Sequence, residues 1–275
     1  MAAITCDYFS ISRRGVVSFT AVLPVERPPL PDQPPSYTEG PFSTLYLLHG
    51  FSGNRNDWLL NTRIAEMAAK RGLAVIMPDG RNSFYLDIEA SQDNCGEFIG
   101  SELVDMTRRM FPLSKKREDT AIGGLSMGGY GAVRNGLKYA DTFGAILSYS
   151  AALITDEVAH KCEGEDDFMA PYSYYRHTFG DPKELAGSDK DPKHLAQMRL
   201  TEGNAPRLFL ACGKEDFLYD CNSDFHAYLE KIGYLHAWWE RPGVHNFDFW
   251  NESLPASLDW LFGTPNGGSC DAGIG

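Results

Sequence analysis

The sequence predicts an α/β fold in which a mostly parallel central sheet carries helices on both faces. Between residues 42 and 262, short apolar runs typical of buried strands alternate with segments whose apolar residues recur at helical spacing. Parallel strands need helical crossovers, and these cover both faces of the sheet. A chain of 275 residues suits one such domain or two smaller ones. We assign residues 1–275 to a single domain.

The order of elements follows from the same patterns. Two β-prone runs, 5–12 and 16–23, flank a short turn and predict a hairpin. The proline-rich segment 24–41 predicts a connection without regular structure. Strands are expected at 42–48, 73–77, 120–123, 143–149, 207–212 and 236–240. Helices are expected at 58–71, capped by Asn56 or Asp57, and at 98–111, 127–139, 220–232 and 247–262.

Two segments depart from the alternation. Residues 155–203 are rich in charge, glycine, proline and aromatic residues, and an insertion of this kind between strands predicts a small cap over a pocket. Residues 263–275 form a polar, glycine-rich tail that we expect to be disordered.

The composition narrows the classes of function. The formal net charge is −12, and because nucleic acid is bound by clustered Lys and Arg, we expect no nucleic-acid partner. No apolar run reaches about 18 residues, so no membrane span is expected. The N-terminus lacks the pattern of a signal peptide, which favours a cytoplasmic protein. The six cysteines are scattered and are expected as free thiols.

Residues 124–128 read G-L-S-M-G, the strongest chemical signal in the chain. The pattern G-x-S-x-G marks the nucleophile elbow of the α/β-hydrolase fold, a sharp turn from a strand into a helix that exposes a serine hydroxyl. Side chains beside this serine would clash with neighbouring backbone, so glycine is needed there. The expected strand before the motif and helix after it fit this context. We therefore predict an α/β-hydrolase fold with Ser126 as nucleophile, rather than a glycine-rich turn with an incidental serine.

An acid that orients the catalytic histidine is expected after a later strand, because the chain order in this fold is nucleophile, acid, histidine. Asp216 follows the strand expected at 207–212 and is the predicted acid. Glu215 and Asp220 lie close to it in sequence and remain alternatives.

His245 is the predicted general base, which a serine hydroxyl needs in order to act as a nucleophile. It follows the strand expected at 236–240 and precedes the last helix, in a loop from which the imidazole can reach back to Ser126. The other six histidines lie within a helix, at a strand start, in the insertion or ahead of the nucleophile: His226, His236, His160, His177, His194 and His49.

Attack on an ester carbonyl creates an oxyanion, which preorganised backbone amides stabilise. Met127, directly after the nucleophile, supplies one N–H group. Phe51, after the strand expected at 42–48, is predicted to supply the second, since Gly50 allows a tight bend; the alternative is that His49-Gly50 is only a turn. Neither H-E-x-x-H nor G-x-G-x-x-G occurs, so we predict no metal and no cofactor.

Seven short segments spread over the chain carry a family resemblance. They are 47–54 (LLHGFSGN), 77–80 (MPDG), 83–85 (SFY), 111–114 (FPLS), 124–132 (GLSMGGYGA), 213–219 (GKEDFLY) and 245–250 (HNFDFW). Together they resemble the tributyrin esterase family, within the putative-esterase branch that also contains S-formylglutathione hydrolase, feruloyl and acetylxylan esterases, and mycolyltransferases. The resemblance implies a carboxylesterase for short acyl chains, with its triad on Ser126, Asp216 and His245. Val244 stands where the family commonly has a second glycine before the histidine, and the segment 24–41 is long for the family.

Residues and resemblance together predict a serine carboxylesterase that hydrolyses short-chain acyl esters, acetyl or butyryl, through an acyl-enzyme on Ser126. Feruloyl esters and acetyl groups on plant polysaccharide are further candidates, so the expected partner is a small-molecule or saccharide-linked ester. A thioesterase of the S-formylglutathione hydrolase type and an acyltransferase are alternatives on the same triad. An intact triad argues against a non-enzymatic interaction protein. The oligomeric state stays open, although the resemblance suggests a homo-oligomer. Five aromatic residues are candidates to line an acyl pocket, although most residues of this kind belong to the core: Trp58, Tyr85, Tyr130, Trp238 and Trp239.

Overall fold

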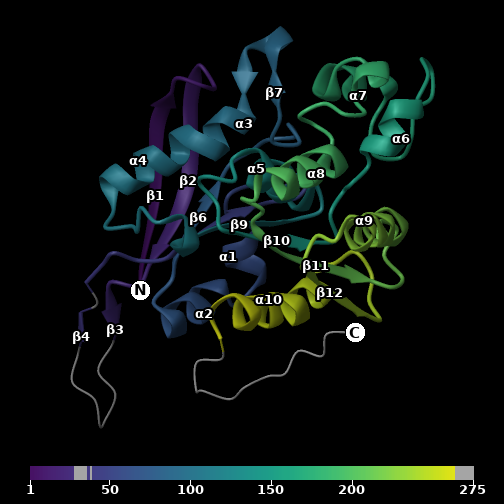
Figure 1. The fold of residues 1–275 in the computed structure, drawn as a ribbon. Coiled ribbons are helices and arrows are strands. Elements are labelled where there is room, and N and C mark those ends of the chain that lie inside the picture. The colour runs from purple at the N-terminus through teal and green to yellow at the C-terminus, as the bar shows by residue number, and fades with distance from the viewer. Residues whose placement is uncertain (28–35, 38, 264–275) are drawn as a thin grey trace.

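The computed structural model describes residues 1–27, 36–37 and 39–263, and an eight-stranded sheet runs through its centre (Figure 1). Its strands are β1 (Ala2–Ser10), β2 (Gly15–Leu23), β5 (Thr44–Leu48), β6 (Ala74–Pro78), β9 (Thr120–Leu125), β10 (Ala145–Tyr149), β11 (Arg207–Gly213) and β12 (His236–Arg241). They lie in the order β1-β2-β6-β5-β9-β10-β11-β12. All pairs from β6 to β12 are parallel, whereas β2 is antiparallel to both of its neighbours. The mostly parallel α/β sheet and the N-terminal hairpin are thus confirmed.

Helices cover both faces of this sheet. They are α1 (Asp57–Asn61), α2 (Ile64–Arg71), α3 (Cys95–Glu97), α4 (Leu103–Met110), α5 (Met127–Lys138), α6 (Thr155–His160), α7 (Tyr172–Phe179), α8 (Pro192–Glu202), α9 (Tyr219–Ile232) and α10 (Phe247–Phe262). One apolar cluster joins α1, α2 and α10 to the sheet, and another joins α4, α5, α8 and α9 to its opposite face. In Figure 1, α2 and α10 accordingly lie below the strands, and α4, α5 and α8 lie above them.

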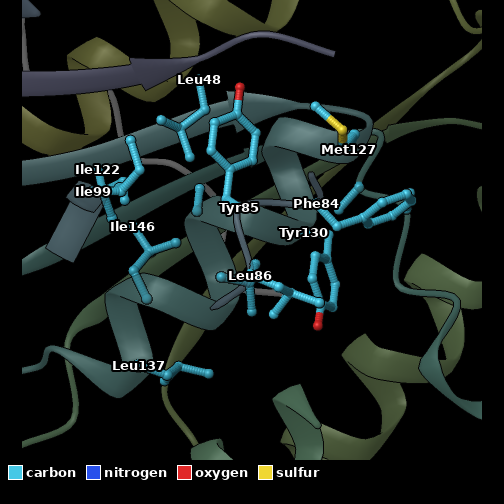
Figure 2. Packing of buried hydrophobic residues seen from close by; sticks show 14 of the residues in the cluster. Leu48, Phe84, Tyr85, Leu86, Ile99, Ile122, Met127, Tyr130, Leu137 and Ile146 are labelled. Atoms are coloured by element: carbon cyan, nitrogen blue, oxygen red, sulfur yellow. The ribbon is translucent and has the colours of Figure 1, made fainter. Parts of the chain in front are cut away.

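Residues of the central strands alternate between these two clusters. In β5, Leu45 and Leu47 belong to the α10 side, and Tyr46 and Leu48 belong to the α5 side. Successive side chains of a strand point to opposite faces, so a strand buried on both faces is apolar throughout. Figure 2 shows the α5 side, where Leu48 lies near the ring of Tyr85.

The chain changes direction across the sheet between β5 and β9. From β5 it crosses to β6 on one side, and then returns to β9 on the other side of β5. In open parallel sheets, ligands bind beyond the carboxyl ends of the strands at such a switch point, because the loops diverge there and leave a crevice. The loops after β5 and β9 therefore flank the expected position of a site.

Several expected elements differ in detail from those observed. The helix expected at 58–71 is two helices, because the backbone of Thr62 is extended and interrupts the helical path between them. The helix expected at 98–111 begins earlier, at α3, and contains a π-helical turn at Phe98–Glu102. Asn56 precedes α1 but makes no side-chain cap hydrogen bond, since its Oδ1 accepts from the Thr20 hydroxyl.

Two connections contain elements that the sequence patterns did not indicate. The proline-rich connection includes two-residue strands, β3 (Glu26–Arg27) and β4 (Ser36–Tyr37), which pair with each other. A second short pair, β7 (Asp87–Ile88) and β8 (Asp93–Asn94), follows β6. The insertion 155–203 contains α6, α7, a 3₁₀ turn at Pro182–Glu184 and α8. Residues 28–35 and most of the expected C-terminal tail lie outside the described residues.

Candidate active site

Ser126 stands at the sharp turn between β9 and α5. Its backbone has φ +56° and ψ −119°, a strained conformation for a residue with a side chain. Hydrogen bonds on both sides hold this conformation: the Ser126 amide donates to the Tyr149 carbonyl at 2.9 Å, and the Ser126 carbonyl accepts from the Ala152 amide at 2.9 Å. The predicted turn from strand to helix is therefore present at residues 124–128.

The glycines of this turn are explained by close backbone contacts. A Cβ atom on Gly128 would lie 2.5 Å from the carbonyl oxygens of both Leu48 and His49, and one on Gly124 would overlap the backbone of Gly128. These neighbours are main-chain atoms and cannot rotate away, so only glycine allows α5 to start directly against the end of β5.

His245 and Asp216 contact each other. The Nδ1 atom of His245 lies 2.9 Å and 3.0 Å from the two carboxylate oxygens of Asp216. A carboxylate can only accept, so Nδ1 carries a proton and donates it into this contact. In the neutral imidazole, Nε2 is then unprotonated and can accept a proton.

The Asp216 carboxylate is fully buried and remains ionised. Burial alone would raise its pKa, but hydrogen bonds from the His245 ring and from the Leu218 amide, the latter at 2.9 Å, together hold the pKa of Asp216 below its ordinary value. The neighbouring acids do not contact the imidazole within the described residues: Glu215 accepts from the Gly243 amide, and Asp220 lies in the first turn of α9.

Two aromatic rings hold the His245 ring in place. The Trp250 ring, in α10, lies edge-to-face against it with centroids 5.1 Å apart, and the Phe217 ring lies 4.6 Å away on another side. The Trp250 indole also donates to the Ser150 hydroxyl at 3.1 Å, just beyond β10. The imidazole is therefore anchored to the same end of the sheet that carries Ser126.

The three predicted triad residues follow the carboxyl ends of three parallel strands in the same half of the sheet. Ser126 follows β9, Asp216 follows β11 and His245 follows β12. The structure brings Asp216 and His245 into contact, whereas the Ser126 hydroxyl makes no hydrogen bond within residues 1–27, 36–37 and 39–263. Hydrogen bonds between catalytic groups are often long before substrate binds and tighten in the complex.

Two backbone amides near the Ser126 turn have no hydrogen-bond partner within the described residues. Met127 begins α5, so its N–H has no carbonyl partner in the preceding turn. The Phe51 amide likewise donates to no group in the described part of the chain. A Cβ on Gly50 would lie 3.5 Å from the Cβ of Ser126, which places the start of the Phe51 loop against the nucleophile turn.

His49 braces this loop as a buried, neutral side chain. Its Nε2 accepts from the Gly80 amide at 2.9 Å, and its Nδ1 therefore donates to the Gly50 carbonyl at 2.7 Å. Burial lowers the pKa of His49, which keeps the ring uncharged. The Tyr85 hydroxyl donates to the His49 carbonyl at 2.9 Å and adds a further brace.

A cavity of about 330 Å³ lies beside these groups. Its wall combines the insertion with residues next to the candidate site, among them Phe51 and Phe217. None of the five aromatic residues considered for an acyl pocket lines this cavity. Trp58, Tyr85 and Tyr130 are buried core residues, Trp238 stacks on His226, and Trp239 packs against Phe249. The lining aromatics gave no sequence signal of their own, because their exposure depends on how the insertion folds.

Two further predictions concern the whole chain. In the described ranges, no helix is both long enough and apolar enough to traverse a bilayer. Five cysteines in the same ranges are free thiols, and the sixth, Cys270, lies outside them.

Comparisons with known proteins identify the family and the fold of this chain. Residues 30–261 match the Esterase family model, described as "Putative esterase". The chain is 41% identical to an acetyl esterase of Caldicellulosiruptor saccharolyticus over 95% of this chain and 98% of the relative.

Among solved structures, the fluorophosphonate-binding serine hydrolase F of Staphylococcus aureus matches with a TM-score of 0.81 at 29% identity. The S-formylglutathione hydrolase of the same organism matches with a TM-score of 0.78, also at 29% identity. Each match covers 95% of this chain and 98% of the other. The fold is accordingly that of the α/β-hydrolases, and the predicted resemblance to the esterase branch is confirmed. The chain belongs to the Esterase family and is a serine carboxylesterase, a carboxylic-ester hydrolase.

Proposed function

We propose that Ser126, His245 and Asp216 are the catalytic triad of this esterase, with the amides of Phe51 and Met127 as its oxyanion hole. The observation that carries the proposal is the 2.9 Å contact between His245 Nδ1 and the buried Asp216 carboxylate, at the sheet edge where the strained Ser126 turn lies. This contact leaves His245 Nε2 free to accept a proton, which is the state that a general base requires.

In the first half-reaction, Ser126 Oγ attacks the ester carbonyl while His245 Nε2 takes the hydroxyl proton. The negative charge on the carbonyl oxygen is stabilised by the two amides, because their N–H dipoles are already oriented. His245 then returns the proton to the alcohol oxygen as the bond between carbonyl carbon and that oxygen breaks. The alcohol leaves, and the acyl group stays on Ser126.

In the second half-reaction, water replaces the alcohol. His245 takes a proton from water, the resulting hydroxide attacks the acyl-enzyme, and the proton passes to Ser126 Oγ as the carboxylic acid is released. Throughout, the Asp216 carboxylate stabilises the imidazolium that forms in each step.

The substrates that we propose are short acyl esters, with acetyl esters first and butyryl esters next. The 41% identical relative is an acetyl esterase, which supports a small acyl group. Acetylated saccharides fit the same reaction with a different alcohol part, and feruloyl esters fit it with a different acyl part. A thioester substrate is the second candidate, because one matching structure at 29% identity is an S-formylglutathione hydrolase.

Fluorophosphonate labelling and ester turnover test the triad. Wild type should react with the probe and hydrolyse 4-nitrophenyl acetate, whereas Ser126→Ala should lose both while keeping its melting temperature. Ser91→Ala, which removes a serine hydroxyl on an exposed 3₁₀ turn, is the matched control and should keep both. Retention of ester turnover by Ser126→Ala would refute the assignment.

A panel of acetyl, butyryl, octanoyl and feruloyl esters, with S-formylglutathione, separates the two substrate classes. We expect the highest kcat/KM for acetyl or butyryl esters. A higher value for S-formylglutathione would replace the ester proposal by the thioester one.

A further inference from the structure

Six of the thirteen residues that line the cavity beside the candidate site are aromatic. Residues on the insertion and on three loops at the sheet edge contribute six rings: Phe51, Phe84, Phe168, Tyr174, Tyr175 and Phe217. The rings contact one another, since Phe51 meets Tyr174 at 5.6 Å and Phe168 meets Phe217 at 5.4 Å between centroids. Phe168 is 80% exposed and Phe217 is 55% exposed, so these two rings form the solvent-facing part of the wall.

The Phe217 ring links this cavity to the proposed general base, His245. In the proposed mechanism His245 protonates the alcohol oxygen, so that oxygen must lie next to the imidazole. The Phe217 ring lies 4.6 Å from the His245 ring and also lines the cavity. An alcohol group longer than methyl therefore extends from His245 past Phe217 into this space.

The charges around the cavity are unbalanced. Glu157 and Asp167 are among its lining residues, and none of the described lining residues is Lys, Arg or His. Lys161 lies behind this wall with its side chain 10% exposed, and its ammonium group contacts Asp167 at 2.8 Å and Glu157 at 3.3 Å. Two carboxylates thus face one ammonium group, which leaves one net negative charge.

The two carboxylates differ in how many hydrogen bonds and ion pairs they already make. Asp167 accepts from the Tyr175 hydroxyl and from the amides of Met169 and Ala170, all at 3.0 Å or less, in addition to Lys161. Within the described residues, the carboxylate of Glu157 has one polar partner, Lys161, and the Glu157 side chain is 61% exposed. Glu157 is therefore the acid that is free to attract a charged substrate group.

Aromatic faces and a carboxylate together attract organic cations. The negative face of an aromatic ring stabilises a nearby cation, and a quaternary ammonium group needs no hydrogen-bond acceptor. The ammonium of Lys161 already lies 5.1 Å above the Tyr175 ring, so this wall stabilises a cation in the structure itself. The net charge of −12 adds a long-range attraction for cations.

Resting on the proposed function, we propose that this cavity is a specificity subsite for the alcohol part of the ester. It favours an alcohol that carries a quaternary ammonium group, accepts a neutral one and disfavours an anionic one. The same charge pattern disfavours the two carboxylates of a glutathione thioester.

Three acetyl esters of similar shape and different charge test this proposal. They are acetylcholine, its uncharged isostere 3,3-dimethylbutyl acetate, and the acetyl ester of 2-hydroxyethanesulfonate. Each kcat/KM is divided by the rate at which hydroxide hydrolyses the same ester, which removes differences in intrinsic reactivity. At low ionic strength we expect the cationic ester to exceed the neutral one about tenfold and the anionic ester to fall below it.

Two variants, each of which removes one negative charge, test whether the preference for the cationic ester arises at Glu157. Glu157→Gln should lower the preference for acetylcholine over its isostere about threefold. Asp156→Asn is the matched control, since Asp156 lies on the same helix, does not line this cavity and contacts Lys193. It should leave the preference unchanged.

The outcomes separate this proposal from the function on which it rests. A normalised ratio near one in wild type, or equal losses in Glu157→Gln and Asp156→Asn, would overturn the subsite while the neutral ester is still hydrolysed. Failure of wild type to hydrolyse any of the three esters would instead count against both the subsite and the proposed function.

Discussion

Replacement of Asp216 by asparagine tests the proposed triad through its buried carboxylate. The carboxylate serves two donors, the His245 ring and the Leu218 amide, and has no exposed surface at which water could substitute. Asparagine keeps the shape but offers one oxygen for these two donors and adds an NH₂ group that can only donate.

Both carboxylate oxygens lie within 3.0 Å of His245 Nδ1, so the NH₂ group of asparagine faces Nδ1 in either orientation of the amide. Because two donors cannot face each other, Nδ1 must become the unprotonated nitrogen, and Nε2 then carries the proton that blocks it as a base. The imidazolium also loses its negative partner. We expect kcat to fall by about 10⁴, which corresponds to about 5 kcal/mol of transition-state stabilisation.

The assay is hydrolysis of 4-nitrophenyl acetate by Asp216→Asn, with urea unfolding to show that the variant is folded. Glu215→Gln and Asp220→Asn are matched controls, because each removes one carboxylate from the same loop region, and both should retain kcat within a few-fold. The reasoning is refuted if Asp216→Asn stays within tenfold of wild type while one of these controls loses activity.

Three further predictions follow from the same geometry. Gly128→Ala should lower the free energy of unfolding by about 1–3 kcal/mol and abolish ester turnover, because its Cβ would overlap the Leu48 and His49 carbonyls. Urea unfolding measures the loss of stability. Gly15→Ala is the control and should unfold like wild type, because the atom nearest to its Cβ is 3.7 Å away. Gly50→Ala should lower kcat by up to about 10²-fold with little change in KM, since its Cβ displaces the Leu125 side chain beside Ser126; an unchanged kcat in steady-state assays would argue against the Phe51 amide as an oxyanion donor. Because the pKa of Asp216 is lowered in the folded state, its ionised form stabilises the protein above about pH 4, and this stabilisation is lost as pH falls through the folded pKa. The free energies of unfolding of wild type and Asp216→Asn, measured in urea, should therefore converge in acid. A constant difference between the two free energies down to pH 3 would contradict this prediction.

Local sequence patterns were sufficient to predict the structure wherever a short segment contains the residues that fix its own conformation. The turn at Ser126 is recognisable because a strand that bends directly into a helix excludes side chains at Gly124 and Gly128, and the contacts of both glycines agree with this. The sequence also predicted that the candidate catalytic residues gather at one edge of the sheet, because the loops at the carboxyl ends of parallel strands meet there. The start of α10 matched because the Asn246 side chain caps it, and its end matched because Gly263 follows with a positive φ.

Other features required the assembled chain. Glu215, Asp216 and Asp220 carry the same local signal, and only the paths of the loops after β11 and β12 decide that Asp216 lies against His245. The break at Thr62 opposes a continuous helical pattern, because Trp58 must bury its ring and donate to the Leu48 carbonyl while α2 packs elsewhere on the sheet.

The sequence by itself thus determined the sheet, the nucleophile turn and the candidate serine and histidine, since these depend on periodicity, glycine sterics and chain order. The tertiary structure alone decided which acid contacts the histidine, which rings line the cavity and how Glu157 and Lys161 set its charge. These features depend on distances between residues far apart in the chain, and such distances arise only when the insertion packs against the loops of the sheet.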